Sequence, residues 1–471
     1  MTAVMVSLAY VVGILTALHA VMSTRTAQGA IAWSVSLITL PFVAVPAYWI
    51  FGRNKFLGFI HARQWQLDAL SDLLEQARLA VRSKARMLGF ADEGIQAAER
   101  LARLPATAGN ELELLVDGDA TFDSIIEGII RAEEYILIQF YIVRDDDLGK
   151  RIKDKLIERA QAGVQVSFLY DEIGSHGLSS PYLDDLQAAG VVIHAFNTRK
   201  GRRNRFQINF RNHRKIVVVD GRECWLGGLN IGDEYLGKDP KVGPWRDTHL
   251  HITGPATIAV QLSFTEDWNW ATESLPENLQ WSPTSAPGAD AGVLVVSSGP
   301  ADKFDTAALM YMHAISIARE RIWIASPYFV PDEGIVSVLQ LACFRGVDVR
   351  VMIPDKTDNR LVTLATYSFF DETHAAGVQF YRYLPGFMHQ KVMLIDDVLA
   401  SVGTANFDNR SFRLNFEITA VAADRKFAME VESMLNDDFT RCRKMESNEF
   451  TSKPLWFRLA ARASRLSSPI L

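Results

Sequence analysis

The stretch HRKIVVVDGRECWLGGLN, residues 213–230, has a counterpart in HQKVMLIDDVLASVGTAN, residues 389–406. In both stretches a lysine follows the histidine by two positions, an aspartate by seven and an asparagine by seventeen. The chain has ten histidines, and only His213 and His389 have a lysine at the second following position. The repeated spacing indicates two homologous halves, each of which supplies one copy of the motif.

Each motif is predicted to enter a buried strand, because residues 216–219 and 392–395 are short apolar runs. Side chains two positions apart on a strand point to the same face, so each histidine should lie beside its lysine. Lysine ammonium and asparagine amide groups donate hydrogen bonds, which suits an anionic, oxygen-rich group such as a phosphate. The predicted phosphate ligands are Lys215, Lys391, Asn230 and Asn406.

Carboxylates near the motifs are candidates to hold the two histidines. Asp220 and Asp396 directly follow the predicted strands, and a carboxylate there can fix an imidazole in one tautomer. Glu234 and Glu417 lie near the motif ends and could support the opposite histidine or lysine. The candidate catalytic residues are His213, Lys215, Asp220, His389, Lys391 and Asp396, with Glu234 and Glu417 as supporting residues.

The doubled motif resembles that of the phospholipase D superfamily, and further stretches are similar to bacterial cardiolipin synthases over nearly the whole chain. These stretches are IQFYIVRDD (138–146), GGLNIGDEY (227–235), SPYFVPD (326–332), LPGFMHQK (384–391) and GTANFDNRS (403–411). Two departures are mild. Gly228 stands where many superfamily members have serine, a feature that cardiolipin synthases often share, and Thr404 takes the equivalent place in the second motif.

The resemblance implies an α/β fold of two phospholipase D-like domains, packed as a pseudo-twofold pair around one active site. It implies transfer of a phosphatidyl group from one phosphatidylglycerol to another, giving cardiolipin and glycerol through a phosphohistidine intermediate. His213 is implied as the nucleophile and His389 as the acid and base, although the symmetry of the motifs leaves that order open. No cofactor and no metal are expected, because the lysines supply the positive charge.

Four other functions compete with this one. The nearest rivals are another phosphatidyltransferase and a phospholipase D hydrolase, which would use water as the acceptor and release phosphatidic acid. A nucleic-acid phosphodiesterase is disfavoured by the net charge of −6 and by the apolar N-terminus. A membrane scaffold with a degenerate site is disfavoured because all eight motif residues are present.

Three cysteines without CxxC spacing argue against a disulfide framework or a zinc site, and they fit a reducing compartment.

The N-terminal residues 1–55 are predicted to form a two-helix transmembrane hairpin. Residues 2–22 and 29–51 contain no charged side chain, and each is long enough to cross a bilayer. Pro41 and Pro46 should kink the second helix. A cleaved signal peptide is the alternative, but no basic segment precedes the first span. More basic residues follow the second span than join the two, which predicts a multi-pass protein of the bacterial cytoplasmic (inner) membrane with its catalytic domains in the cytoplasm.

The remaining chain divides by composition. Residues 56–108 are predicted to be a helical, membrane-proximal stalk. Residues 109–275 and 290–445 both alternate strands with helices, as expected for two related α/β domains.

Two basic segments are candidates for lipid contact. The run Arg199, Lys200, Arg202, Arg203 and Arg205 favours anionic lipid headgroups over a solvated loop or a nucleic-acid patch. The tail, residues 453–471, is amphipathic. It fits either a helix in the membrane interface or a terminal helix docked on the protein. The predicted partners are thus phosphatidylglycerol and a membrane, without nucleic acid; the oligomeric state is not readable from the sequence.

Overall fold

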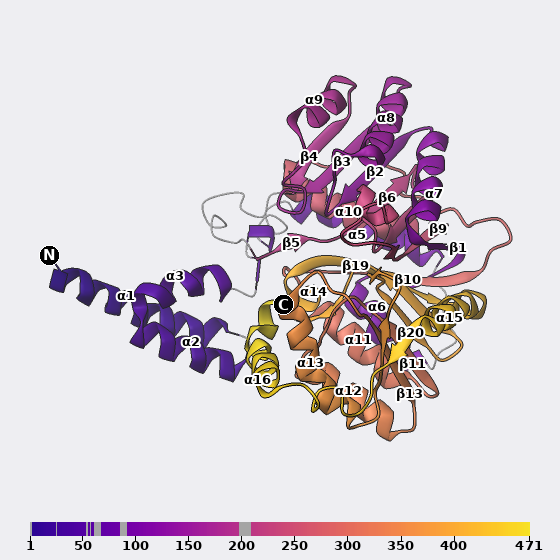
Figure 1. Cartoon of the computed structure of the whole chain (residues 1–471). Helices are drawn as coiled ribbons and strands as arrows, with labels where there is room; N and C mark the ends of the chain where they lie inside the picture. Colours follow the sequence, from indigo (N-terminus) through magenta and orange to yellow (C-terminus); the bar gives the residue numbers. More distant parts are fainter. Residues whose placement is uncertain are drawn as a thin grey trace.

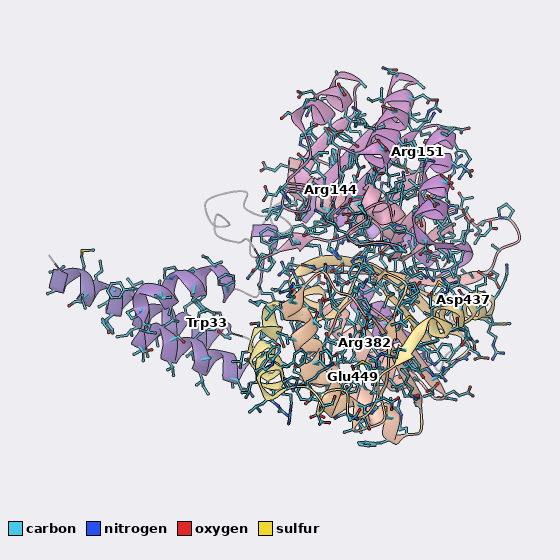
Figure 2. The ribbon with its side chains drawn as sticks, viewed as in Figure 1. Trp33, Arg144, Arg151, Arg382, Asp437 and Glu449 are labelled. Atoms are coloured by element: carbon cyan, nitrogen blue, oxygen red, sulfur yellow. The ribbon has the colours of Figure 1, made fainter. Side chains whose placement is uncertain are left out.

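The computed structural model describes residues 2–24, 26–52, 55–56, 58–60, 67–84, 92–196 and 209–471. Three N-terminal helices extend away from a larger body in which strands and helices alternate (Figure 1). Trp33, labelled in Figure 2, lies among these helices, well away from the body. The α/β class predicted for residues 109–445 is therefore confirmed.

The first predicted span is one helix, α1 (Thr2–Ser23), whereas the second is two helices, α2 (Ala27–Thr39) and α3 (Pro41–Phe51). The prediction of a single kinked second helix is wrong, because proline lacks an N–H and disfavours helical backbone at the preceding residue. That residue, Leu40, has φ −132° and ψ 57°. Among the described residues, α1 is the one helix long and apolar enough to span a bilayer.

The three helices pack on one another and leave many apolar side chains on their outer surface. Ala17, Ala20 and Leu37 are buried between the helices. The outward-facing apolar residues include Val4, Leu8, Leu18, Val35, Phe42 and Val43. An exposed apolar surface of this extent marks a contact with lipid or with another protein.

The segment predicted to be a stalk packs on the body instead. Helix α5 (Leu67–Arg82) lies on α10 (Thr257–Thr272), and α6 (Asp92–Ala102) lies on α11 (Thr306–Ile317). Before them, the buried Phe56 ring stacks on Phe210 at a centroid distance of 5.2 Å. The stalk prediction missed this because a helical period shows an apolar face without showing what covers it.

The first α/β half runs from β1 to α10. Its strands are β1 (Thr107–Val116), β2 (Tyr135–Phe140), β3 (Gln165–Asp171), β4 (Val192–Phe196), β5 (Arg211–Asn212), β6 (Ile216–Val219), β7 (Glu223–Gly227), β8 (Trp245–Arg246) and β9 (Thr248–Thr253). Its helices besides α10 are α7 (Asp117–Arg131), α8 (Asp147–Gln161), α9 (Ser180–Ala188) and the 3₁₀ turn η1 (Asp233–Leu236).

The second half runs from β10 to β20. Its strands are β10 (Ala291–Ser298), β11 (Arg321–Ala325), β12 (Phe329–Val330), β13 (Asp348–Pro354), β14 (Gln379–Tyr383), β15 (Phe387–Met388), β16 (Val392–Ile395), β17 (Leu399–Gly403), β18 (Phe407–Asp408), β19 (Asn415–Ala423) and β20 (Cys442–Lys444). Its helices besides α11 are α12 (Glu333–Phe344), α13 (Arg360–His374), α14 (Asn409–Arg413) and α15 (Arg425–Thr440). Helix α16 (Leu455–Ser464) and the 3₁₀ segment η2 (Arg465–Ile470) end the chain.

The two halves share one continuous sheet and mirror each other in strand order. From the centre outward the first half reads β1-β9-β7-β6-β2-β3-β4, and the second reads β10-β19-β17-β16-β11-β13-β14-β20. The antiparallel pairing of β1 with β10 joins them. Equivalent strands in equivalent order, related across this pairing, confirm the predicted pseudo-twofold pair of domains.

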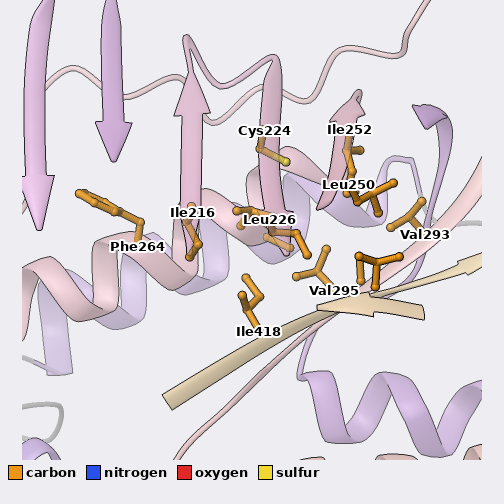
Figure 3. Packing of buried hydrophobic residues seen from close by; sticks show 14 of the residues in the cluster. Ile216, Cys224, Leu226, Leu250, Ile252, Phe264, Val293, Val295 and Ile418 are labelled. Atoms are coloured by element: carbon orange, nitrogen blue, oxygen red, sulfur yellow. The ribbon is translucent and has the colours of Figure 1, made fainter. Parts of the chain in front are cut away.

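Both halves contribute to the apolar core between them. Figure 3 shows Ile216, Leu226 and Leu250 of the first half facing Val295 and Ile418 of the second. All five are at least 96 % buried. A shared core of this kind holds the facing ends of the two halves at a fixed spacing, which a site assembled from both halves requires.

Candidate active site

Each motif enters the site across the boundary between the halves. The short strand β5, just before His213, pairs in parallel with β19 of the second half, and the His213 N–H donates to Phe416 O at 3.0 Å. The equivalent strand β15, just before His389, pairs with β8 of the first half, and the His389 N–H donates to Arg246 O at 2.7 Å. Each histidine is thus anchored to the half that does not carry its motif.

The first histidine is held by a carboxylate of the other half. His213 Nδ1 lies 2.9 Å and 3.1 Å from the two carboxylate oxygens of Glu417. Thr404 Oγ1 donates to the same carboxylate at 2.5 Å, and Asn415 Nδ2 donates at 3.1 Å. Burial alone would raise the pKa of Glu417, but the adjacent His213 and Lys215 outweigh it and lower that pKa. The predicted contact of Glu417 with the opposite histidine is present.

The second histidine is held by a residue that sequence reasoning missed. His389 Nδ1 lies 2.7 Å from Asp247 Oδ2. Asp247 and Glu417 are structural equivalents, since each lies two residues before the one paired with the end of its motif hairpin, His249 with Gly227 and Thr419 with Gly403. The available signal was a carboxylate near the start of the strand that pairs with each motif hairpin, β9 in the first half and β19 in the second. Gly228 also fits this arrangement, because a Cβ there would lie 1.9 Å from Asp247 Oδ1.

Glu234, the other proposed support, does not reach either histidine. Its carboxylate pairs with Arg144 (Figure 2) at 3.1 Å within the first half. The prediction for Glu234 is wrong, because its carboxylate is taken by the Arg144 guanidinium.

The aspartates of the two motifs also have a different role from the predicted one. The Asp220 carboxylate accepts the backbone N–H groups of Glu133, Glu134 and Tyr135 at 2.8–2.9 Å. Asp396 accepts those of Arg319, Glu320 and Arg321 at 2.8–3.3 Å. The prediction that these aspartates orient the histidines is wrong. They lie at the far end of a four-residue strand, so they fasten that strand to its neighbour.

Both lysines are buried beside their histidines. Lys215 Nζ donates to His213 O at 2.6 Å and lies 5.4 Å from the centre of the Tyr141 ring. Lys391 Nζ donates to His389 O, and it also lies 2.9 Å from His389 Nδ1. Burial lowers the pKa of Lys215 to about 7 and that of Lys391 to about 8, against the opposing effect of nearby carboxylates. An anion bound in the site would therefore favour the charged form of each lysine.

Burial favours the neutral form of both imidazoles. Burial lowers the pKa of His213 to about 4 and that of His389 to about 3. The charges of both lysines act on both histidines, which places the four groups in one electrostatic environment. With each Nδ1–H assigned to its carboxylate, each Nε2 carries a free lone pair.

The two asparagines differ in how many hydrogen-bonding groups of their side-chain amides are free. Asn230 Oδ1 accepts the Ile142 N–H at 3.0 Å, and its Nδ2 donates to Tyr235 Oη at 3.1 Å, which leaves one amide hydrogen. Asn406 Oδ1 is buried and has no hydrogen-bond partner in the part of the chain that the structure describes. Both asparagines are buried at the motif ends, as a phosphate-binding role requires.

The residue between each histidine and lysine ties the site to a helix beneath it. Arg214 Nη1 pairs with Asp267 of α10 at 2.8 Å, and the arginine is almost fully buried. In the second half, Gln390 Nε2 donates to Asp438 of α15 at 2.8 Å, and Arg246 also pairs with that aspartate. Buried charge pairs of this kind fix side-chain positions around the histidines.

The basic run Arg199, Lys200, Arg202, Arg203 and Arg205 lies outside the described residues. Within the described ranges, no group of three or more His, Cys, Asp or Glu side chains has the arrangement of a metal site.

Comparisons with known proteins agree with this geometry. A family model described as "Cardiolipin synthase, PLD-like domain" matches residues 125–240 and 311–439, once in each half. A second model, "Phospholipase_D-nuclease N-terminal", matches residues 11–53. The chain is 46% identical to "Cardiolipin synthase A" of Pseudomonas fluorescens and 47% identical to the protein of that name from Pseudomonas putida, covering 99% of this chain and 98% of each relative.

Among solved structures, a phosphatidylserine synthase from Haemophilus influenzae aligns with a TM-score of 0.62 and 16% sequence identity. The alignment covers 80% of this chain and all of the other. At that identity the likeness shows a shared fold.

Proposed function

The chain belongs to the cardiolipin synthase family of phospholipase D-like proteins, and we propose that it joins two phosphatidylglycerol molecules into cardiolipin and releases glycerol. It is a membrane-associated phosphatidyltransferase that acts on phospholipid. The observation that carries the proposed chemistry is the pair of buried, neutral histidines, each bonded through Nδ1 to a carboxylate of the other half.

In the first step, His213 Nε2 attacks the phosphorus of one phosphatidylglycerol. A phosphorus–nitrogen bond forms and the bond to the glycerol oxygen breaks, while His389 gives its Nε2 proton to the departing glycerol. The Glu417 carboxylate stabilises the positive charge that develops on His213. For His389 to carry that proton, its pKa must rise, and a phosphodiester anion bound next to it has that effect.

In the second step, the neutral His389 removes the proton from a free hydroxyl of a second phosphatidylglycerol. The resulting oxygen attacks phosphorus, the phosphorus–nitrogen bond breaks, and His213 is regenerated. Lys215, Lys391, Asn230 and Asn406 stabilise the non-bridging oxygens in both steps. One proton leaves and one returns to His389, so the cycle balances. The family resemblance, and not the near-symmetric geometry, supports His213 rather than His389 as the nucleophile.

The apolar N-terminal helices support a location at the membrane. We propose that α1, together with α2 and α3, crosses the bacterial cytoplasmic membrane and leaves both α/β halves in the cytoplasm. The basic residues that follow the last of these helices support that orientation.

The test uses the purified full chain in liposomes of phosphatidylglycerol, with lipid products read by mass spectrometry. We expect cardiolipin and glycerol in equal amounts. Phosphatidic acid with glycerol but no cardiolipin would make the protein a hydrolase. His213→Ala and His389→Ala should each abolish the product without changing membrane insertion, and near-full turnover in either variant would overturn the two-histidine mechanism.

A further inference from the structure

The C-terminal segment, α16 with η2, is docked on the second half by one face. Ala461 and Ser464 of α16 are buried against α13. The Phe457 ring packs edge-on against Tyr367 at a centroid distance of 5.1 Å, and Arg465 pairs with Glu372 at 2.9 Å. The segment is therefore an integral part of the body and has a fixed orientation.

The opposite face of the same segment is apolar and open. Leu455 and Trp456 are 68 % exposed, Leu459 is 59 % exposed and Leu466 is 85 % exposed. A soluble surface rarely gathers large apolar side chains on one short helix. Two arginines border this face: Arg458 and Arg462 both lie 5.9 Å from the Phe450 ring, and Arg462 is largely exposed. The apolar face that the sequence predicts is thus not the face that docks.

Hydrogen bonds through Arg410 and Asn209 link the C-terminal segment to the last N-terminal helix, α3. Arg410 of α14 donates its backbone N–H to Leu471 O at 2.7 Å and its Nη1 to Ile470 O at 3.2 Å. Its Nη2 donates to Asn209 O at 2.7 Å, and Asn209 Nδ2 lies 3.4 Å from Ile50 O at the end of α3. Figure 1 shows α16 on the side of the body from which the N-terminal helices extend.

We propose that α16 and η2 form a second membrane contact, with Leu455, Trp456, Leu459 and Leu466 inserted at the level of the lipid headgroups. The occupant of this face is an anionic phospholipid surface. Indole and leucine side chains prefer that depth, and flanking arginines pair with lipid phosphates. This inference rests on the membrane location of α1–α3 and not on the transfer reaction.

The contact has a consequence for the active site. Arg410 joins the C-terminal segment to α14, which begins three residues after Asn406 of the second motif. Contact with the membrane at both α3 and α16 therefore fixes the tilt of the two α/β halves relative to the bilayer. The second motif then stays at one height above the bilayer surface. The N-terminal helices alone would leave that tilt free.

The first experiment places an environment-sensitive fluorophore on Trp456→Cys of the full chain, in vesicles of phosphatidylglycerol and phosphatidylcholine. The control is Met429→Cys, another exposed apolar position, on α15, a helix that Figure 1 shows on the side of the body away from the N-terminal helices. We expect blue-shifted emission at position 456 and quenching by headgroup-labelled nitroxide lipid that is at least about twice that at 429. Equal quenching at both positions would overturn the proposal, whether or not the protein makes cardiolipin.

A second experiment separates membrane contact from folding. Leu455→Ser combined with Leu459→Ser changes two exposed side chains that lie on the open face, so the melting temperature should not move. We expect cardiolipin formation on bilayers to fall by about tenfold, while formation from detergent-dispersed lipid stays near the wild-type rate. A rate that is unchanged on bilayers, or equally reduced in both conditions, would contradict the proposed contact.

Discussion

Replacing Glu417 with glutamine keeps the shape of the site and removes one charge. The carboxylate lies 2.9 Å from His213 Nδ1, so its charge is about 4 Å from the centre of the imidazole ring. At an effective dielectric constant of about 20, two unit charges at that separation attract by about 4 kcal/mol. The imidazole acquires its positive charge as it attacks phosphorus, so the lost attraction falls mainly on the transition state, and the rate should fall by about a thousandfold.

The assay for Glu417→Gln is the initial rate of cardiolipin formation by the purified full chain in phosphatidylglycerol liposomes. Glu223→Gln is the matched control, because Glu223 is a mostly buried carboxylate of the sheet that bonds to Arg131 and His251 and lies outside the site. We expect the control to stay within about threefold of the wild type. A Glu417→Gln rate within that same range would refute the electrostatic role assigned to Glu417.

Three further results are expected. Asp247→Asn should slow cardiolipin formation by about a hundredfold or more, yet release the first-turnover burst of p-nitrophenol from a phosphatidyl p-nitrophenol at near the wild-type rate, because that leaving group needs no proton from His389 and the burst precedes the step in which His389 acts as base; equal loss in both measurements would be inconsistent with an acid role. Asp220→Ala should lower the free energy of unfolding by about 3 kcal/mol, seen in the melting temperature, because three backbone N–H groups lose their acceptor; a hundredfold loss of kcat with unchanged stability would instead restore a catalytic role. The pKa values of Lys215 and Lys391, about 7 and 8, mean that the attracting charges are present below these values and lost above them, so the KM for phosphatidylglycerol should rise as the pH passes from about 7 to 9; a KM that is flat over this range would contradict the role of the lysines.

Much of the site was predictable because the chemistry repeats within the chain. Two histidines with lysines at the same spacing indicate two halves and one phosphate site without any knowledge of the fold. The strand between each lysine and aspartate was also readable, since four consecutive apolar residues are typical of a strand buried on both faces. The same reasoning led to the wrong role for the aspartates. Asp220 is close to His213 in the sequence, but the extended strand Ile216–Val219 lies between them and separates their side chains in space.

The rest depended on contacts between distant segments. The partners of the two histidines come from the opposite half, and the crossing of β5 onto β19 and of β15 onto β8 has no local sequence signal. Glu417 was a candidate because it lies close to the second motif, whereas Asp247 lies seventeen residues after Asn230 and was overlooked. The helices before β1 were placed in a stalk for a similar reason: their partners, α10 and α11, are far away in the chain.

The most direct measurement is to find the covalent intermediate. The full chain is mixed with phosphatidylglycerol liposomes, quenched within one turnover and digested, and the peptides that contain residues 213 and 389 are analysed by mass spectrometry. A His213 nucleophile predicts a phosphatidyl adduct on His213 and none on His389. The Glu223→Gln control, which turns over, should carry the same adduct on His213. The same adduct on His389, or full turnover with no adduct on either histidine, would contradict it.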